Sequence, residues 1–579
     1  MMTPGEPSSN RASPLVRPYV LTGGRTADEV VMPPETLVRA TGRSPAASFS
    51  APSAAALSAL REGISGPVFE PGDEGFAVEQ AGSFGAPAHR PLAVVGARTS
   101  DDVRSAVEFA AEHGLPVAVQ STGHGNLSNT DGALLISTRR MRRLEIDRRQ
   151  RSVKVAAGVI WRDVIDEAAP YRLAPVCGSA PSVGVIGYTL GGGLSPLGRT
   201  YGFSADYVRK IEVVTADGYR RLVDGDHEPD LFWAMRGGKG NFGVVTAMEF
   251  GLVDEPELYG GGLYYDGKDA EAVLRSYVRW APLLPATMTT SIALLGSTAG
   301  LQLPGASAAC PLVHLRIAHI GTVEQGSALL TPMRSVATPL LDTVAQRPFT
   351  SIAEVHEDPT TPIAADKRGG VLTELTDDTV SALLTTMNTS AKPVLFVELR
   401  QLGGAFHRYG SDIGSVGHRD AAYSVYVVSA PIDAGSSVSG STRLLEAIAP
   451  WAAGGVPVNF LGSANAPADV ARAWDADTHH RLIGIKQAWD PDNMFRFGYP
   501  LIAPPRQVSP EAAELLRRCQ EATSVAELAA SLGLPLGVVR VLLADLVEAG
   551  MVNTYRFDPE RAADTQLLGE VLDELRKRV

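Results

Sequence analysis

The chain of 579 residues contains little cysteine, no long apolar run and no excess of positive charge. Its three cysteines, Cys177, Cys310 and Cys519, have no metal-ligand spacing, which argues against a zinc site and a disulfide framework. No apolar run reaches the roughly 18 residues of a membrane span, and the amino terminus lacks the apolar core of a secretory signal. We therefore expect a reduced, cytoplasmic protein with no membrane span. The net charge of −12 argues against attraction to nucleic acid or anionic membranes.

Two common nucleotide-binding signatures are missing as well. No glycine-rich run is closed by Gly-Lys-Ser/Thr, as a Walker phosphate loop requires. No strand leads into a Gly-x-Gly-x-x-Gly helix start with an acidic residue about twenty positions later, the pattern of a nicotinamide Rossmann site. The glycine-rich runs that are present therefore serve another ligand or form ordinary turns.

Short apolar strands and amphipathic helices alternate from Pro91 onward. The helix predicted at 100–113 takes Ser100 as its N-cap, and its apolar residues recur at i, i+3, i+4 and i+7. Further pieces of this region are a helix at 161–168, a hairpin turn at 215–218, and strands at 92–95, 117–119, 133–136, 153–157 and 211–215.

Linkers rich in proline, alanine and serine divide the chain. Strands predicted at 261–265, 394–402 and 421–429 mix with helices at 269–280 and 441–449, which is typical of an α+β lobe. Beyond Pro504 the pattern is helical, with helices at 510–522, 524–532, 536–549 and 565–577 and a small β-wing at 551–557. We expect a disordered tail at 1–16, a small segment at 17–45, an α/β domain at 52–250, the lobe at 251–455, a return segment at 456–503 and a winged-helix-like domain at 506–579.

Two glycine-rich loops in the α/β region are candidates for binding a phosphate-bearing cofactor. One follows the strand at 117–119 and carries His124, and the other runs from Ala180 to Gly193. Glycine lets a backbone approach a phosphate closely, and exposed amides in such a loop form an anion-binding nest. Ordinary turns also use glycine, so either loop taken alone stays compatible with a structural role.

Several motifs occur in order: Gln-Ser-Thr-Gly-His-Gly at 120–125, Ser-Val-Gly-Val-Ile-Gly-Tyr-Thr-Leu-Gly-Gly-Gly at 182–193, Arg-Thr-Tyr-Gly at 199–202, Val-Val-Thr-Ala-Asp-Gly at 213–218, Asp-Leu-Phe-Trp-Ala-Met-Arg-Gly-Gly-Lys-Gly-Asn-Phe-Gly-Val-Val-Thr at 230–246, and Lys486 to Phe495. With these motifs, residues 52–503 resemble the FAD-linked oxidases of the berberine-bridge-enzyme-like family. The resemblance implies an α+β, two-lobed, vanillyl-alcohol-oxidase-type FAD-binding fold with an α+β substrate lobe.

The resemblance also implies how FAD is held. His124 stands where the family's histidine carries FAD covalently through the 8α-methyl group, although a lone loop histidine can also be structural. The family's attachment cysteine corresponds to Ala180, so we expect no cysteinyl link. The cofactor-binding residues implied are Ser121, Thr122, Gly123, His124, Gly125, Asn126, Val183, Gly184, Gly187, Tyr188, Gly191, Gly192, Gly193, Gly243, Val244 and Val245.

For catalysis, the resemblance implies hydride transfer from a small organic substrate to flavin N5, with O2 as acceptor and a base to take a proton. Tyr426 corresponds to a position where relatives place an acid, amide or tyrosine, but it is equally compatible with an aromatic packed in its strand. A phenol acts as a base only if its pKa is lowered, and the nearby cations to consider are His418, Arg419 and Arg400. Tyr188 replaces a common histidine near the flavin.

One expected catalytic residue is missing. The family's Tyr-Val-Asn segment is Pro457-Val-Asn here, so a mechanism with two tyrosines does not transfer intact.

The two ends of the chain belong together by a second resemblance. Arg17–Thr26 and Ser524–Gly550 resemble the two parts of a small winged-helix-like conservon domain of unknown function. Insertion of the oxidase into this domain is cheap where the ends of the host loop lie close together. Between Ser509 and Val579, eight Arg and Lys residues face twelve Asp and Glu residues, so docking to a protein is favoured over DNA.

Three functions follow from the sequence. The first is a flavin oxidase acting on a small molecule. The second is a catalytically weakened flavin protein that docks a partner through residues 506–579. The third is a redox-responsive DNA-binding regulator.

Overall fold

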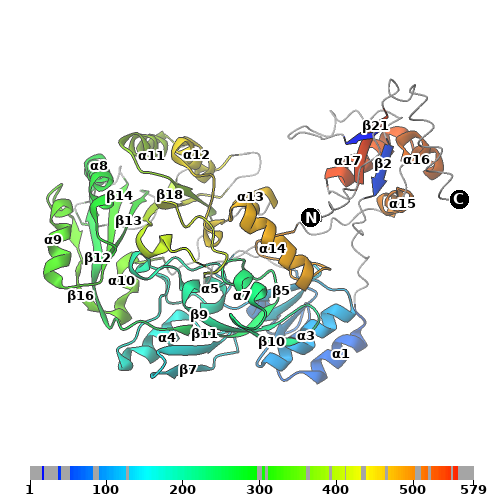
Figure 1. The fold of residues 1–579 in the computed structure, drawn as a ribbon, viewed down its shortest axis with the longest axis horizontal. Coiled ribbons are helices and arrows are strands. Elements are labelled where there is room, and N and C mark those ends of the chain that lie inside the picture. Colours follow the sequence, from blue (N-terminus) through cyan, green and yellow to red (C-terminus); the bar gives the residue numbers. More distant parts are fainter. Residues whose placement is uncertain are drawn as a thin grey trace, which may run out of the picture. The chain divides into compact units, whose positions relative to one another are not determined.

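In the computed structural model the chain forms two compact units, one of Met1–Ser50 with Pro504–Val579 and one of Ala51–Ala503 (Figure 1). The structure describes residues 16–18, 37–40, 52–82, 90–125, 130–296, 303–304, 306, 311–359, 365–389, 394–410, 413–431, 438–462, 467–502, 510–519, 523–548 and 552–557. Among these, no single helix is long and apolar enough to cross a membrane, although 525–532 and 536–547, bent by 116°, meet the criteria as a pair.

The first sheet of the larger unit has the order β3 (Val68–Phe69), β4 (Ala93–Gly96), β6 (Leu134–Ser137) and β5 (Val117–Gln120). The last three strands are parallel, so the carboxyl ends of β4, β5 and β6 lie at the same edge of the sheet. Helix α3 (Ser100–Glu112) joins β4 to β5. The predicted N-cap Ser100 is wrong, because Thr99 caps the helix. The Thr99 hydroxyl accepts from the backbone amide of Asp102, and the Asp102 carboxylate accepts from the backbone amide of Thr99.

A second sheet, fully antiparallel, packs on the other side of α3, which contacts both sheets. Its order is β10 (Arg220–Val223), β9 (Val208–Val214), β11 (Val244–Gly251), β8 (Ser152–Ala156) and β7 (Leu144–Asp147). The predicted hairpin at 215–218 is confirmed by the pairing of Val214 with Arg220. The remaining helices of this lobe are α1 (Ala54–Gly63), α2 (Phe76–Gln80), α4 (Trp161–Ala168), α5 (Val185–Thr189), α6 (Gly198–Tyr201) and α7 (Pro229–Met235).

The second lobe is built on one antiparallel sheet. Its order is β15 (Leu341–Asp342), β12 (Glu257–Tyr265), β14 (Leu312–His319), β13 (Met288–Leu295), β18 (Val394–Gln401), β19 (Tyr423–Ser429) and β17 (Asp366–Leu372), with β16 (Ala345–Pro348) on β12. Four helices, α8 (Ala270–Trp280), α9 (Val323–Arg334), α11 (Asp377–Thr389) and α12 (Gly440–Ala447), lie along one face of it (Figure 1).

The two faces of this sheet differ in chemistry. Alternate residues such as Val397, Leu399 and Val425 form an apolar core with the helices. The intervening residues are largely polar, and the elements beyond them include α10 (Ala353–His356) and the first lobe. The α+β lobe predicted from the sequence is thus confirmed, while its role in binding substrate stays a prediction.

A return segment closes the larger unit with α13 (Pro467–Ala471) and α14 (Ala476–Trp489). The fully buried Lys486 ammonium donates to the carbonyls of Asn241 (2.7 Å) and Phe495 (2.8 Å) and to the Asp490 carboxylate (2.5 Å). Asp490 in turn accepts from the amides of Met494 and Phe495. This arrangement ties the segment's end to the loop that precedes β11.

The smaller unit combines pieces from both ends of the chain. Its antiparallel sheet has the order β1 (Val16–Pro18), β21 (Val552–Phe557), β2 (Leu37–Ala40) and β20 (Thr523–Ser524), and its helices are α15 (Pro510–Arg518), α16 (Val525–Leu532) and α17 (Leu536–Glu548). The predicted capping box of Ser524 and Glu527 is confirmed. The predicted wing is a strand between β1 and β2 rather than a separate hairpin.

Some predicted features lie outside the described residues. They are the tail at 1–15, most of Arg17–Thr26, the part of the linker at 45–54 that precedes Pro52, Asn126 and the helix at 565–577. The assignment of 506–579 as a winged-helix-like domain stays a prediction.

Candidate functional site

The two glycine-rich loops lie against each other in the first lobe. β5 ends at Gln120, whose amide group donates to the carbonyls of Gln80 and Ala81 and so fixes the start of the His124 loop. A β-carbon placed on Gly184 would lie 3.4 Å from Ser121 Oγ and 3.6 Å from Thr122 Cγ2. Ser121 and Thr122 thus lie in direct contact with the start of α5.

Glycine is required at the end of the second loop. Gly192 and Gly193 have φ of +95° and +78°. A β-carbon on Gly193 would lie 2.5 Å from Tyr188 Cε1, and one on Gly191 would lie 2.1 Å from Asn459 Oδ1. By contrast, β-carbons on Gly125 and Gly187 would meet nothing within 4 Å. The backbone at Gly191 and Gly193 is therefore tightly packed against neighbouring side chains, while the backbone at Gly125 and Gly187 faces open space.

Buried polar atoms at these loops fit a polar cofactor. Ser121 Oγ and the Tyr188 hydroxyl are buried, and neither has a hydrogen-bond partner in the described part of the chain. Leaving such an atom unsatisfied costs about 1–3 kcal/mol. Exposed backbone, small residues and unused donors are the features that the phosphates and the polar ring edge of FAD require.

His124 has the chemistry needed for a bond to carbon. The side chain is half-buried, and burial lowers its pKa to about 4, with the Lys367 charge acting in the same direction and Asp358 opposing it. The imidazole is therefore neutral at pH 7 and keeps a lone pair on one ring nitrogen.

The predicted contacts at the start of β11 lie deeper. Val244 and Val245 pair with Val214 and Val213 in the second sheet and belong to the core of the first lobe. A β-carbon on Gly243 would lie 2.5 Å from the carbonyl oxygen of Val214. Their contact with the cofactor stays a prediction.

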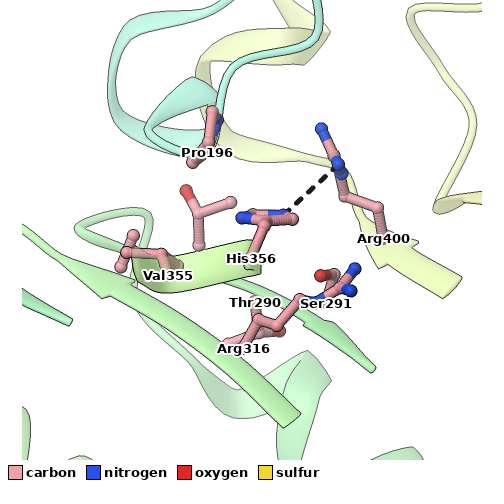
Figure 2. A pocket seen from close by; sticks show the side chains of 9 residues that line it. Pro196, Thr290, Ser291, Arg316, Val355, His356 and Arg400 are labelled. Atoms are coloured by element: carbon pink, nitrogen blue, oxygen red, sulfur yellow. Dashed lines mark hydrogen bonds between the residues drawn. The ribbon is translucent and has the colours of Figure 1, made fainter. Parts of the chain in front are cut away.

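The polar face of the large sheet carries a buried group of charges. The Glu398 carboxylate accepts from Arg316 Nη1 at 3.0 Å and from Arg400 Nη2 at 3.1 Å, and His356 Nε2 lies 3.5 Å away. Arg400 also donates to the carbonyl of Leu194, at the end of the second glycine loop. Figure 2 shows His356 on α10 pointing toward Arg400, where the nitrogen atoms lie 3.3 Å apart. This group therefore links the sheet to the first lobe.

Burial and pairing set the protonation of these residues. Burial raises the pKa of Glu398, but Arg400, His356 and Arg316 outweigh it and hold the pKa well below its ordinary value. Burial lowers the pKa of His356. A cavity of about 10 Å³, room for roughly one water, is lined by Pro196, Thr289, Thr290, Ser291, Arg316, Ala318, Val355, His356 and Arg400 (Figure 2).

The two candidate tyrosines lie at this interface, but neither is activated. Tyr426 on β19 packs beside Phe460, with ring centres 5.0 Å apart, and burial raises its pKa. Burial also raises the pKa of Tyr188, whose ring meets Trp161 edge-on at 5.7 Å. A phenol whose pKa is raised above its ordinary value near 10 stays protonated at neutral pH, so it cannot accept a proton.

The cations expected beside Tyr426 are engaged elsewhere. Arg419 forms a buried ion pair with Asp206 at 2.5 Å. His418 has a φ of +56°, and its Nε2 lies 2.7 Å from the carbonyl oxygen of Arg472. Neither is among the groups with the largest effects on the pKa of Tyr426, which are Tyr499, Glu398, Asp358 and Asp366. A catalytic role for His418 stays a prediction without support from these contacts.

Sequence reasoning missed Arg316, Glu398, His356 and Asp358. A signal was present for the first two, because strict alternation in Leu312–His319 and Val394–Gln401 places each on the polar face of its strand. No local pattern marks His356 or Asp358, since His356 ends a helix of only four residues and Asp358 lies in the loop after it.

Comparisons with known proteins place an FAD-binding domain in the first lobe. Residues 91–223 match the family described as FAD binding domain, and residues 463–499 match the family described as berberine and berberine like. The (R)-6-hydroxynicotine oxidase of Paenarthrobacter nicotinovorans is 26% identical over 475 residues, which cover 75% of this chain and 96% of that protein. The chain is an FAD-dependent oxidase that resembles the berberine-like family.

Solved structures share the fold of this oxidase. The crystal structure of 6-hydroxy-D-nicotine oxidase from Arthrobacter nicotinovorans has a TM-score of 0.67 at 24% identity and covers 76% of this chain and 98% of its own. Glucooligosaccharide oxidase from Acremonium strictum, described with a 6-S-cysteinyl, 8α-N1-histidyl FAD, has a TM-score of 0.66 at 19% identity and covers 77% and 99%. Residues 499–578 match a protein family of unknown function, DUF742.

Proposed function

We propose that this FAD-dependent oxidase holds FAD through one covalent bond to His124 and oxidises a small organic molecule, with O2 as electron acceptor. The bound cofactor would supply the hydride acceptor. The observation that carries the proposal is the junction of the two glycine loops: exposed backbone at Gly125 and Gly187, unused polar atoms at Ser121 and Tyr188, and a neutral His124 beside them.

A neutral imidazole supports the single link. Only an unprotonated ring nitrogen has the lone pair that forms a bond to carbon. His124 would join this nitrogen to the 8α-carbon of the cofactor, and the flavin with O2 would supply the two-electron oxidation that this bond requires. The chain has alanine at 180, and the cysteine nearest to it in sequence is Cys177. This thiol is buried, and burial raises its pKa to about 12, so no reactive thiolate is available there.

The chain's own residues shape the substrate side. The aromatic pair Tyr426 and Phe460 forms a wall, and the Arg316–Glu398–Arg400 group fixes the sheet against the glycine loop that ends at Gly193. Solved relatives act, by their descriptions, on a hydroxylated nicotine and on glucooligosaccharides. We therefore propose an alcohol or amine substrate, whose C–H is transferred as hydride while an O–H or N–H proton passes to a base.

The test is the flavin itself. Purified protein should absorb near 450 nm, and the colour should stay with the protein after acid precipitation in the wild type but be released from His124→Ala. Anaerobic incubation with alcohols, amines and sugars should bleach the absorbance with at least one compound. Denatured wild-type protein without colour, after growth with ample riboflavin, would show that the His124 link is wrong.

We also propose that residues 506–579 dock a protein rather than nucleic acid. The net charge of this segment is negative, and α17 exposes Val538 and Val541 by 44% and 51%. A gel-shift assay with duplex DNA at low salt should therefore show no complex, and a stable one would favour a DNA-binding role.

A further inference from the structure

The site needs a proton acceptor, and the residues so far described are poor ones. Burial raises the pKa of Tyr426 and Tyr188, so both phenols keep their protons at pH 7. The Glu398 carboxylate is saturated by two arginines and is 5% exposed. A base must offer an oxygen or nitrogen that a substrate can reach.

One carboxylate meets that requirement. His356, Glu357 and Asp358 form the end of α10 and the first residues after it, and each side chain is fastened to a different element. His356 lies against Arg400 of β18, while Glu357, at a φ of +52°, accepts from the Tyr264 hydroxyl of β12 at 2.6 Å. Asp358 Oδ2 accepts from the Ser179 hydroxyl at 2.5 Å, across the interface between the lobes.

This attachment places Asp358 beside the cofactor loop. Ser179 is the neighbour of Ala180, at the start of the second glycine-rich loop. Only one Asp358 oxygen is used in the described part of the chain, and the side chain is half-buried rather than enclosed. The second oxygen is therefore available to a donor that enters between the lobes.

The electrostatics of the site agree with this position. The Asp358 charge acts on His124, Tyr188, Arg400 and Tyr426, which come from four different elements. Because screening limits such interactions to short range, these groups lie in the same region of the lobe interface as the carboxylate. Asp358 also helps to hold the guanidinium of Arg400, the cation that contacts the carbonyl of Leu194.

We propose that Asp358 is the catalytic base: its free carboxylate oxygen takes the O–H or N–H proton of the substrate. The adjacent C–H leaves as hydride with both electrons to the FAD, and O2 later receives two electrons and two protons as H2O2. The carboxylic acid then returns its proton to solvent. The inference rests on the proposed function and replaces the missing tyrosine at Pro457 with a residue from a loop after α10.

The chain offers a matched control. Glu357→Gln removes the same charge one residue away, but its oxygen faces Tyr264 and not the glycine loop. Asp358→Asn keeps the shape and the bond from Ser179 while removing the basicity. A difference between the two variants therefore reports on Asp358 itself and not on the loop's stability.

The first measurement uses sodium sulfite, an anion that adds to flavin N5 and bleaches its absorbance. Loss of a nearby negative charge should tighten sulfite binding to Asp358→Asn about tenfold or more, with Glu357→Gln within about twofold of wild type. Equal dissociation constants for wild type and Asp358→Asn would overturn the proposed position of this carboxylate.

The second measurement uses any compound that bleaches the wild-type flavin anaerobically. Bleaching should slow by about 10²–10⁴-fold in Asp358→Asn, and formate should partly restore it in Asp358→Ala. Equal rates in wild type and Asp358→Asn would overturn this inference alone. If the wild-type protein instead binds no flavin, stays colourless and reacts with no compound, the proposed function itself is refuted.

Discussion

The neutral state of His124 predicts how flavin attachment depends on pH. The structure lowers the pKa of this imidazole from 6.5 to about 4, first by burial and then by the charge of Lys367. At pH 5.5 a pKa of 4 leaves about 97% of the side chain neutral, whereas a pKa of 6.5 would leave about 9%. If attachment needs the neutral ring, its rate should be nearly flat between pH 5.5 and 7.5, instead of falling about tenfold.

The assay starts from protein produced under riboflavin limitation, to which FAD is added at each pH. Covalent flavin is counted by fluorescence of the denatured protein on a gel, and circular dichroism at each pH controls for unfolding. Lys367→Met removes a charge that lowers the pKa, so its profile should begin to fall at a higher pH than that of the wild type. Asp358→Asn removes a charge that raises the pKa, so its profile should stay flat.

The reasoning would be refuted by a tenfold loss of rate in the folded wild type between pH 7.5 and 5.5. It would also be refuted if Lys367→Met and Asp358→Asn shifted the profile in the same direction, because the two charges oppose each other at His124. His124→Ala is the negative control, because it should carry no covalent flavin at any pH.

Three further predictions concern stability and attachment. Lys486→Met should lower the free energy of unfolding by about 3–5 kcal/mol, because it leaves the buried Asp490 charge uncompensated. The exposed Lys210→Met should change it by less than about 0.5 kcal/mol; thermal and urea unfolding measure both variants, and equal effects would contradict the role of the buried pair. Glu398→Gln should cost about 3–5 kcal/mol by leaving Arg316 and Arg400 buried together, and an unfolding midpoint equal to that of the exposed Glu446→Gln would argue against it. Introducing Ala180→Cys into His124→Ala should restore acid-stable flavin through the thiol, if position 180 lies at the ring edge as the family resemblance implies; flavin released by acid from the double variant would contradict that placement.

Much of the first lobe was predictable because its determinants are local. Helix 161–168 was predicted with its observed bounds, and the strands were displaced by at most three residues at either end. The cap of α3 was missed by one residue, since Thr99 and Ser100 are both good N-caps and only the bond to Asp102 distinguishes them. The glycine loops were recognisable because their positive φ and close contacts admit little else.

The catalytic side was less predictable because its contacts join residues far apart in the chain. Arg400 donates to Leu194 over 206 positions, and Ser179 donates to Asp358 over 179. The cations considered for Tyr426 were His418, Arg419 and Arg400. In the structure Arg419 pairs with Asp206, His418 turns toward Arg472, and Arg400 pairs with Glu398. A tyrosine's pKa depends on burial by the assembled lobes, which no single segment encodes.

The pairing of Ala40 with Val552 in the smaller unit has a consequence for synthesis. At about 5–20 residues per second, a ribosome needs roughly half a minute to two minutes to produce the chain between these two partners. The intervening oxidase can fold in that interval, while β1 and β2 remain without β21. The smaller unit therefore forms only on chains that extend past β21, and a partner that recognises it would select these chains over products truncated before Val552.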